Sequence, residues 1–256
     1  MVGRCHAFRF ERIYIKCDTI FIDDLLQVLT EQAGKLLHTS NVYHNEWAGK
    51  LAELLVTLTR TEGGLGYTVA GNQGPNAKVF FSNSGTEANE GALKIARKVG
   101  KDRWAACASN RSWDDAACTK TRIVCFENSF HGRSMGALSV TINAKYQKPF
   151  MPLIPGVDVG KLNDLEGLEN LVGEDTCAVI VEPVQGEGGI HNASEEWLRA
   201  LRKRCDDVGA VLIFDEIQVR CLSYKMIVHK LIRFAVRAVQ DWNIMGTFAV
   251  TRRLSS

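Results

Sequence analysis

The segment Val211-Leu212-Ile213-Phe214-Asp215-Glu216-Ile217-Gln218 decides the fold. Its first four residues are continuously apolar, as strands of a parallel sheet covered on both faces tend to be. Two carboxylates follow where such a strand would end, and the sequence after Gln218 is basic and of a different kind. The segment therefore predicts a buried parallel strand with acids at its carboxyl end.

Other short apolar runs predict more strands of this type, over residues 78–82, 122–126 and 177–181, in addition to the first strand, which we place at residues 210–214. A helix is predicted after residue 82, because apolar side chains recur there on one helical face: Ala88, Ala92, Ile95, Ala96 and Val99. A second helix is predicted over residues 198–208. Alternating strands and helices predict an α/β fold with a mostly parallel sheet.

The composition of the 256 residues suits a soluble α/β protein. Hydrophobic residues make up 46% of the chain, enough for a substantial core. No apolar run approaches the roughly 20 residues of a membrane span, and no nucleic-acid partner is expected. The eight cysteines contain no C-x-x-C pair, so buried free thiols in a reducing compartment are expected rather than a zinc site or disulfides.

Charge divides the chain unevenly. Residues 219–256 hold seven Lys/Arg and one acid, a balance of +6 in a chain of net charge +2, so residues 1–218 sum to −4. The apolar spacing over residues 227–239 could form a basic amphipathic helix for a membrane surface or a partner. The alternative, which we favour, is an unrelated basic tail appended by a gene-model or splicing error. We predict three parts: a divergent amino-terminal segment (1–28), a core domain (29–218) and this tail (219–256).

The amino-terminal segment gives a weak targeting signal. Four basic residues within residues 1–28 faintly resemble a mitochondrial transit segment, but four acids are unusual in one and serines are absent. A functional transit peptide is therefore not expected there.

The turn Ser82-Asn83-Ser84-Gly85-Thr86-Glu87-Ala88-Asn89-Glu90 has the chemistry of an anion cradle. Ser84 and Glu87 fit a capping box, and Gly85 would let a ligand approach the backbone closely. The N–H groups of the first helical turn and the helix dipole favour a phosphate, which Gly85 and Thr86 would hold. The alternative is a well-capped helix without a ligand.

Two predicted strands end in acids, Glu182 and Asp215. Ligands of open α/β sheets gather at the carboxyl ends of strands, and Asp215 there could keep a pyridine nitrogen protonated. Glu182 opens a loop, residues 182–189, whose glycines permit packing against a flat ligand. The alternatives are a helix-capping acid and, for Gly188-Gly189, a tight turn.

The loop after the strand at 122–126 reads Glu127-Asn128-Ser129-Phe130-His131-Gly132-Arg133. Phe130 could stack on a planar cofactor, whereas a single Phe is ordinarily a core residue. A single His is ordinarily a hydrogen-bonded loop residue, so for Phe130 and His131 both a ligand-binding role and an ordinary structural role stay open.

These four motifs, residues 82–90, 130–133, 181–189 and 214–218, stand in the order and spacing of class III aminotransferases, which the chain resembles from about residue 29 to 218. Within that family it is most similar to the fungal acetylornithine aminotransferases of the mitochondrial matrix, although ornithine, 4-aminobutyrate and succinylornithine aminotransferases share the motifs. The resemblance implies pyridoxal 5′-phosphate as cofactor and part of the large domain of the fold type I transferases, with helices on both faces of the sheet.

The resemblance also implies residue roles. Gly85 and Thr86 would bind the cofactor phosphate, and Asp215 would pair with the ring nitrogen. Phe130 and Ile217 would pack on the two faces of the ring, and Gln218 would reach the ring hydroxyl. The full set of expected cofactor-binding residues is Ser84, Gly85, Thr86, Phe130, His131, Glu182, Asp215, Ile217 and Gln218. On the substrate side, Glu187 would lie beside the substrate, and Tyr43 and His44 near its entrance.

The departures from the family lie after residue 218. The Schiff-base lysine expected there is absent, because Lys225 and Lys230 lack its context, and the small domain is missing. We therefore expect a truncated enzyme, impaired in transferring an amino group between N-acetylornithine and 2-oxoglutarate.

Two alternatives are another ω-aminotransferase, such as ornithine aminotransferase, and a non-catalytic fragment that pairs with the full-length enzyme. The resemblance implies a homodimer, which we do not expect a truncated chain to form. The resemblance implies a mitochondrial location, and the amino terminus as given implies a cytoplasmic one.

Overall fold

The computed structural model describes residues 19–40, 42–61, 78–217, 242–245 and 248–251. The chain divides into two units, residues 1–49 and 50–256. The first contains helix α1 (Thr19–Ala33), and the side chain of Trp47 there donates a hydrogen bond from Nε1 to Gln32 Oε1 at 2.9 Å. Helix α2 (Glu46–Thr61) begins in the first unit and continues into the second. No described helix is long and apolar enough to cross a membrane.

A seven-stranded sheet forms the centre of the second unit, in the order β1-β9-β8-β7-β4-β2-β3. Its strands are β1 (Val79–Phe81), β2 (Arg122–Phe126), β3 (Val157–Gly160), β4 (Thr176–Val181), β7 (Val211–Phe214), β8 (Trp242–Met245) and β9 (Phe248–Thr251). Strands β3, β2, β4, β7 and β8 run parallel, whereas β9 is antiparallel to β8 and β1. The predicted α/β fold with a mostly parallel sheet is therefore confirmed.

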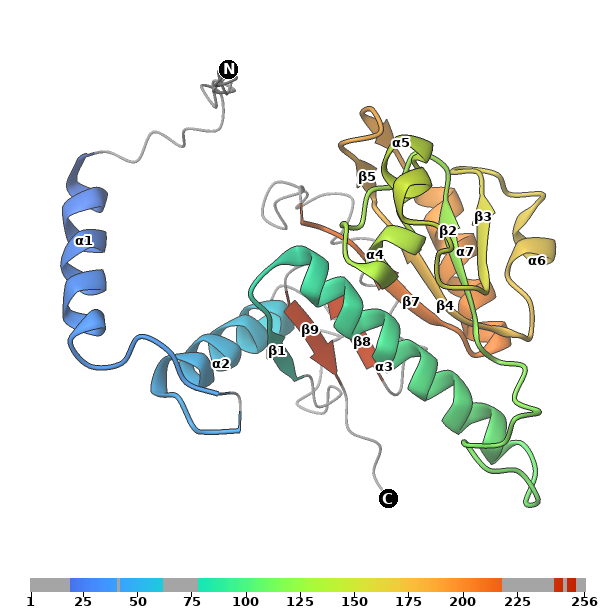
Figure 1. Ribbon diagram of the computed structural model, residues 1–256, viewed down its shortest axis with the longest axis horizontal. Coiled ribbons are helices and arrows are strands. Elements are labelled where there is room, and N and C mark those ends of the chain that lie inside the picture. The colour runs from blue at the N-terminus through green and yellow to red at the C-terminus, as the bar shows by residue number, and fades with distance from the viewer. Residues whose placement is uncertain (1–18, 41, 62–77, 218–241, 246–247, 252–256) are drawn as a thin grey trace. The chain divides into compact units, whose positions relative to one another are not determined.

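Helices cover both faces of this sheet (Figure 1). The longest are α3 (Gly85–Ala106) and α7 (Glu195–Val208); α4 (Met135–Ser139), α5 (Ala144–Gln147), the 3₁₀ turn Lys148–Phe150 and α6 (Leu168–Leu171) are short. Alternate residues of a strand point to opposite faces, so Val179 and Val181 of β4 pack in the cluster with α7, and Ala178 and Ile180 in the cluster with α3. This two-sided burial explains why the central strands are continuously apolar.

Helix α7 begins at Glu195, three residues before the predicted start. The Ser194 side chain accepts a hydrogen bond from Trp197 N and so caps the helix, and Gly209 ends it in the left-handed conformation (φ +67°). The first two residues of the helix, Glu195 and Glu196, are polar, so apolar spacing alone did not reveal that the helix begins there.

The basic tail contains structure that the sequence analysis did not predict. Within residues 219–256, β8 and β9 join the sheet beside β7 and β1. Each has four residues, which is too short for a clear alternating pattern. The amphipathic helix predicted over residues 227–239 lies outside the described residues, and the boundaries at 28 and 218 stay predictions.

Three of the described cysteines are buried free thiols, as predicted: Cys125, Cys177 and Cys205. Burial raises the pKa of Cys125 and Cys205 to about 12 and that of Cys177 to about 11, which keeps these thiols protonated and unreactive. Cys107 and Cys118 are also free thiols, but Cys107 is exposed and Cys118 is half-buried. Cys107 caps the carboxyl end of α3, and Cys118 lies in the loop between α3 and β2.

Candidate functional site

The carboxyl ends of three neighbouring parallel strands carry the motif loops. Residues 127–133 follow β2, residues 182–189 follow β4, and Asp215 follows β7. The register aligns Val181 with Phe214, and Asp215 N donates to Val181 O at 2.9 Å. The sheet therefore brings Glu182 and Asp215 to one edge, as the sequence predicted.

The amino end of α3 is capped as predicted, with one change. Ser84 Oγ accepts a hydrogen bond from Glu87 N at 3.3 Å, and the Glu87 carboxylate accepts one from Asn83 N at 2.7 Å. A capping box would instead have returned to the N–H of Ser84. Gly85 and Thr86 occupy the first two helical positions, where backbone N–H groups lack intrahelical acceptors. An anion placed there would meet these donors and the positive end of the helix dipole.

Thr86 also contacts the loop after β2. Its Oγ1 lies 3.2 Å from Ser134 Oγ, within hydrogen-bond distance. Gly132 has a φ of +126°, and a Cβ added to it would lie 1.8 Å from Thr86 Oγ1. Only glycine fits here, because it permits both this backbone angle and this close approach. The loop thus packs directly on the first turn of α3.

Asp215 and His131, both predicted site residues, form a buried pair. Asp215 Oδ2 lies 2.8 Å from His131 Nδ1, and the two residues are 5% and 1% exposed. A carboxylate only accepts, so Nδ1 carries the proton that joins them. His131 Nε2 is buried without a partner among the described residues. His131 is therefore held as a donor to Asp215.

Asn89 completes this cluster, although the sequence analysis assigned it no role. Its Nδ2 donates to Asp215 Oδ2 and to His131 O, each at 2.8 Å. Asp215 Oδ1 accepts only a 3.2 Å bond from Ile217 N among the described residues, so it keeps acceptor capacity. The sequence did contain one signal for Asn89. It is a polar residue three and seven positions before Ala92 and Ala96, and it therefore lies on the same buried face of α3 as these two alanines.

Glu182 anchors the loop after β2. Its Oε2 accepts a hydrogen bond from Phe130 N at 2.9 Å, and the side chain is buried. Burial raises the pKa of the Glu182 carboxyl above its ordinary value, and the hydrogen bond from Phe130 opposes that rise. In this structure Glu182 therefore holds the backbone of Phe130, and its predicted cofactor contact stays a prediction.

This raised pKa gives a prediction for Glu182→Gln. Glu182 has a higher pKa in the folded protein than in the unfolded protein, so between these two pKa values the folded protein binds more protons. The Glu182 carboxyl therefore lowers the free energy of unfolding progressively as pH rises through this range. The amide of Gln does not titrate there. The free energy of unfolding of the variant, relative to the natural protein, is therefore expected to rise with pH. Urea unfolding between about pH 5 and pH 8 measures this difference; a constant difference would contradict it.

Ile217 packs on Gly85. A Cβ added to Gly85 would lie 2.4 Å from Ile217 Cδ1, so any side chain at residue 85 would displace Ile217. The residue predicted for a ring face thus lies beside the residue predicted for the phosphate. Gln218 lies outside the described residues, and its role stays a prediction.

A hollow of about 370 Å³ opens between the loops after β2 and β4. Its lining residues are Asn128, Ser129, Phe130, Ile142, Asn143, Glu187 and Gly188. The hollow brings the predicted ring-stacking residue Phe130 and the predicted substrate residue Glu187 to one cavity. A small-molecule substrate could be received there.

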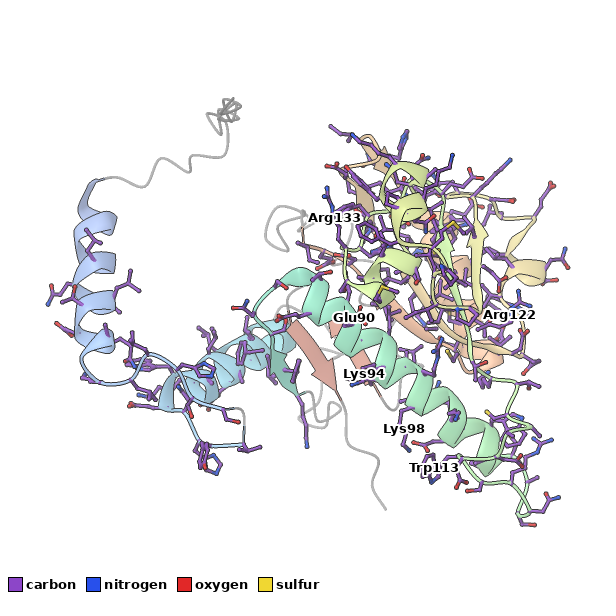
Figure 2. The ribbon with its side chains drawn as sticks, in the orientation of Figure 1. Glu90, Lys94, Lys98, Trp113, Arg122 and Arg133 are labelled. Atoms are coloured by element: carbon purple, nitrogen blue, oxygen red, sulfur yellow. The ribbon has the colours of Figure 1, made fainter. Side chains whose placement is uncertain are left out.

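The rim of this hollow is held by Tyr146. Tyr146 donates from its hydroxyl to Glu187 Oε1 at 2.8 Å, and this bond raises the pKa of Tyr146. Arg133 is labelled in Figure 2. Its guanidinium lies 4.3 Å from the Tyr146 ring centroid, and the Phe130 ring meets the Tyr146 ring edge to face at a centroid distance of 5.9 Å. Tyr146 therefore links residues of both motif loops, a role that the sequence analysis missed.

The glycines after Glu187 serve a turn. A Cβ on Gly188 would lie 2.0 Å from Asn128 O, and Gly189, with a φ of +109°, donates from N to Gly186 O at 3.2 Å. Gly188-Gly189 thus forms the tight turn that the sequence analysis gave as the alternative, and this turn packs closely against the Asn128 backbone. Tyr43 and His44 are exposed residues of the first unit, and their predicted place near the entrance stays a prediction.

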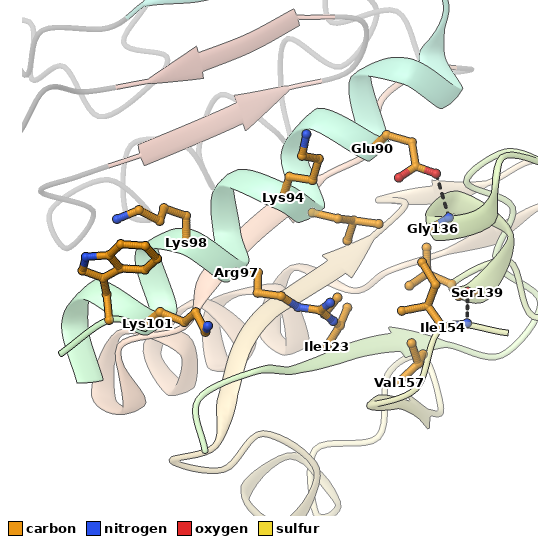
Figure 3. Close-up of a pocket in the computed structure, with 13 residues that line it drawn as sticks. Glu90, Lys94, Arg97, Lys98, Lys101, Ile123, Gly136, Ser139, Ile154 and Val157 are labelled. Carbon is orange, nitrogen blue, oxygen red and sulfur yellow. Dashed lines mark hydrogen bonds between the residues drawn. The ribbon is translucent and has the colours of Figure 1, made fainter. Parts of the chain in front are cut away.

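A second hollow, of about 290 Å³, lies along α3 (Figure 3). Four basic side chains of α3 line it: Lys94, Arg97, Lys98 and Lys101. Ile123 and Val157, at the beginnings of β2 and β3, also line it, so it extends toward the opposite ends of the strands. At its other end Glu90 Oε1 accepts from Gly136 N at 2.7 Å and so joins α3 to α4. None of the predicted site residues that the structure describes lines this hollow.

Comparisons with known proteins identify the family of this chain. Residues 22–220 match the family model Aminotransferase class-III. The mitochondrial acetylornithine aminotransferase of Yarrowia lipolytica is 53% identical over 195 residues, 76% of this chain and 42% of the relative. That of Neurospora crassa is 48% identical over 196 residues, 77% of this chain and 38% of the relative. The chain thus spans about two fifths of the length of these curated relatives.

Among solved structures, N-acetylornithine aminotransferase from Stenotrophomonas maltophilia is 30% identical, with a TM-score of 0.58 over 90% of this chain and 52% of that one. The expected likeness to the large domain of fold type I transferases is thereby confirmed. Because the family model covers most of the chain, this protein belongs to the class III aminotransferase family.

Proposed function

We propose that this chain forms the pyridoxal-phosphate-binding part of an aminotransferase of arginine biosynthesis. The observation that carries the proposal is the buried Asp215, held by His131 and Asn89 at the sheet edge that the first turn of α3 also reaches. The names of the curated relatives support N-acetylornithine as amino donor, and 2-oxoglutarate is the 2-oxo acid that the resemblance implies. The fungal relatives are named mitochondrial, which supports that location.

The residues present fit this cofactor. Pyridoxal phosphate supplies an electron sink when its ring nitrogen is protonated. Asp215 Oδ1 keeps the acceptor capacity that would hold this proton, and the amino end of α3 offers donors for the phosphate. Thr86 would add its hydroxyl, and Phe130 would pack against the ring. Glu187 at the hollow would orient the substrate.

The proposal is tested by titrating the chain with pyridoxal phosphate and following absorbance and fluorescence. Saturable binding is expected, and Asp215→Asn should weaken it about 10- to 100-fold, because a neutral amide cannot replace the charge-assisted bond. Asp175→Asn is the matched control. Asp175 lies just before β4, at the end of the strand opposite to Glu182, and its carboxylate pairs with the Arg122 guanidinium at 3.2 Å. Neither substitution changes a lysine, so any reaction of lysines with the aldehyde of pyridoxal phosphate contributes the same background to all three titrations. Equal affinities for the three would overturn the proposal.

A further inference from the structure

Asn89 joins three segments that are far apart in the sequence. It lies in α3, and its amide nitrogen donates to the loop after β2 at His131 O and to the end of β7 at Asp215 Oδ2. Both bonds measure 2.8 Å, and the residue is 2% exposed. An amide nitrogen has two hydrogens, so its donor capacity is fully used. Such a satisfied, buried amide fixes the geometry of its acceptors.

The consequence falls on the orientation of the Asp215 carboxylate. Among the described residues, its Oδ2 accepts hydrogen bonds from both Asn89 Nδ2 and His131 Nδ1, whereas Oδ1 accepts one only from Ile217 N, at 3.2 Å. Two donors on Oδ2 oppose rotation of the carboxylate about its Cβ–Cγ bond. With Asn89 absent, only one of these two donors to Oδ2, His131 Nδ1, would remain among the described residues. Asn89 and His131 together therefore keep Oδ1 as the carboxylate oxygen that stays available to a ligand.

We infer that Asn89 is a positioning residue that presents Asp215 Oδ1 to the protonated ring nitrogen of a bound pyridine ligand. This inference rests on the proposed function, because it takes the ligand to be pyridoxal phosphate. Asn89 acts through Asp215 and need not touch the ligand. Its effect should therefore depend on the ring nitrogen and should vanish for a ligand without one.

Two ligands and three variants test the inference. The ligands are pyridoxal 5′-phosphate and the analogue in which C–H replaces the ring nitrogen. Asn89→Leu keeps the branched shape and removes the donor, and Asn89→Ser serves if the leucine variant does not fold. Ser139→Ala is the control, because Ser139 is equally buried but bonds Met135 O and Ile154 N within and beside α4. Affinities are measured by fluorescence titration, and folding by urea unfolding.

Asn89→Leu is expected to weaken binding of pyridoxal phosphate about tenfold and to leave binding of the analogue unchanged. Equal weakening for both ligands would show a general structural role and overturn the inference, as would unchanged binding of both. A natural protein that binds neither ligand would instead overturn the proposed function. The unsubstituted chain thus tests the function, and the variants test Asn89.

Discussion

Gly132→Ala is expected to lower the free energy of unfolding by about 3 kcal/mol or more. Two costs combine at this residue. A φ of +126° strains any side chain, and the new Cβ would lie 1.8 Å from Thr86 Oγ1 and 2.6 Å from Thr86 Cβ. Thr86 stands in the first turn of α3, so it cannot move away without disturbing the helix start. Urea unfolding followed by circular dichroism measures the loss.

Gly156→Ala is the matched control for that variant. Gly156 also has a positive φ, +84°, but a Cβ added there meets nothing within 4 Å. Its substitution carries the conformational cost alone, about 1 kcal/mol. The difference between the two losses therefore measures the clash with Thr86. Equal losses would show that the loop relaxes around the new methyl group, and the tight contact of Gly132 with α3 would then be refuted.

The central strands could be predicted from the sequence because burial on both faces leaves a continuous apolar run. This holds for the runs at 122–126, 177–181 and 210–214, which form β2, β4 and β7 within one residue. Strand β3 was missed, because Val157–Gly160 is short, contains Asp158 and lies at the sheet edge, where burial is partial. Strands β8 and β9 were missed because the basic charge of residues 219–256 led us to interpret this segment as an unrelated tail. Edge and short strands depend on neighbours that a local pattern does not contain.

The site was predicted as far as the strand ends could show it. A run that ends in an acid places Glu182 and Asp215 at one edge, and the structure brings them there. The pairing of Asp215 with His131 and Asn89 joins residues 84 and 126 positions apart, which no local motif reveals. Likewise, Tyr146 reaches Glu187 across 41 positions. The sequence gives the chemistry at each strand end, whereas the partner of each side chain depends on the packing of the loops.

Trp197→Ala is expected to lower the free energy of unfolding by about 4 kcal/mol. Trp197 of α7 is fully buried, meets the Phe126 ring edge to face at a centroid distance of 4.9 Å, and donates from Nε1 to Asp164 O at 3.0 Å. Alanine would leave a large cavity between α7 and the sheet and would leave the Asp164 carbonyl without this donor. Urea unfolding measures the loss, with Trp113→Ala as control.

The control separates burial from the mere removal of an indole. Trp113 is 52% exposed and contacts Lys98 by a cation–π interaction, so its loss should cost no more than about 0.5–1 kcal/mol. Phe126 is the last residue of β2, and the loop with Phe130 and His131 begins directly after it. The cavity therefore opens beneath the strand that carries this loop. If Trp197→Ala costs no more than Trp113→Ala, the indole of Trp197 does not anchor α7 to the sheet.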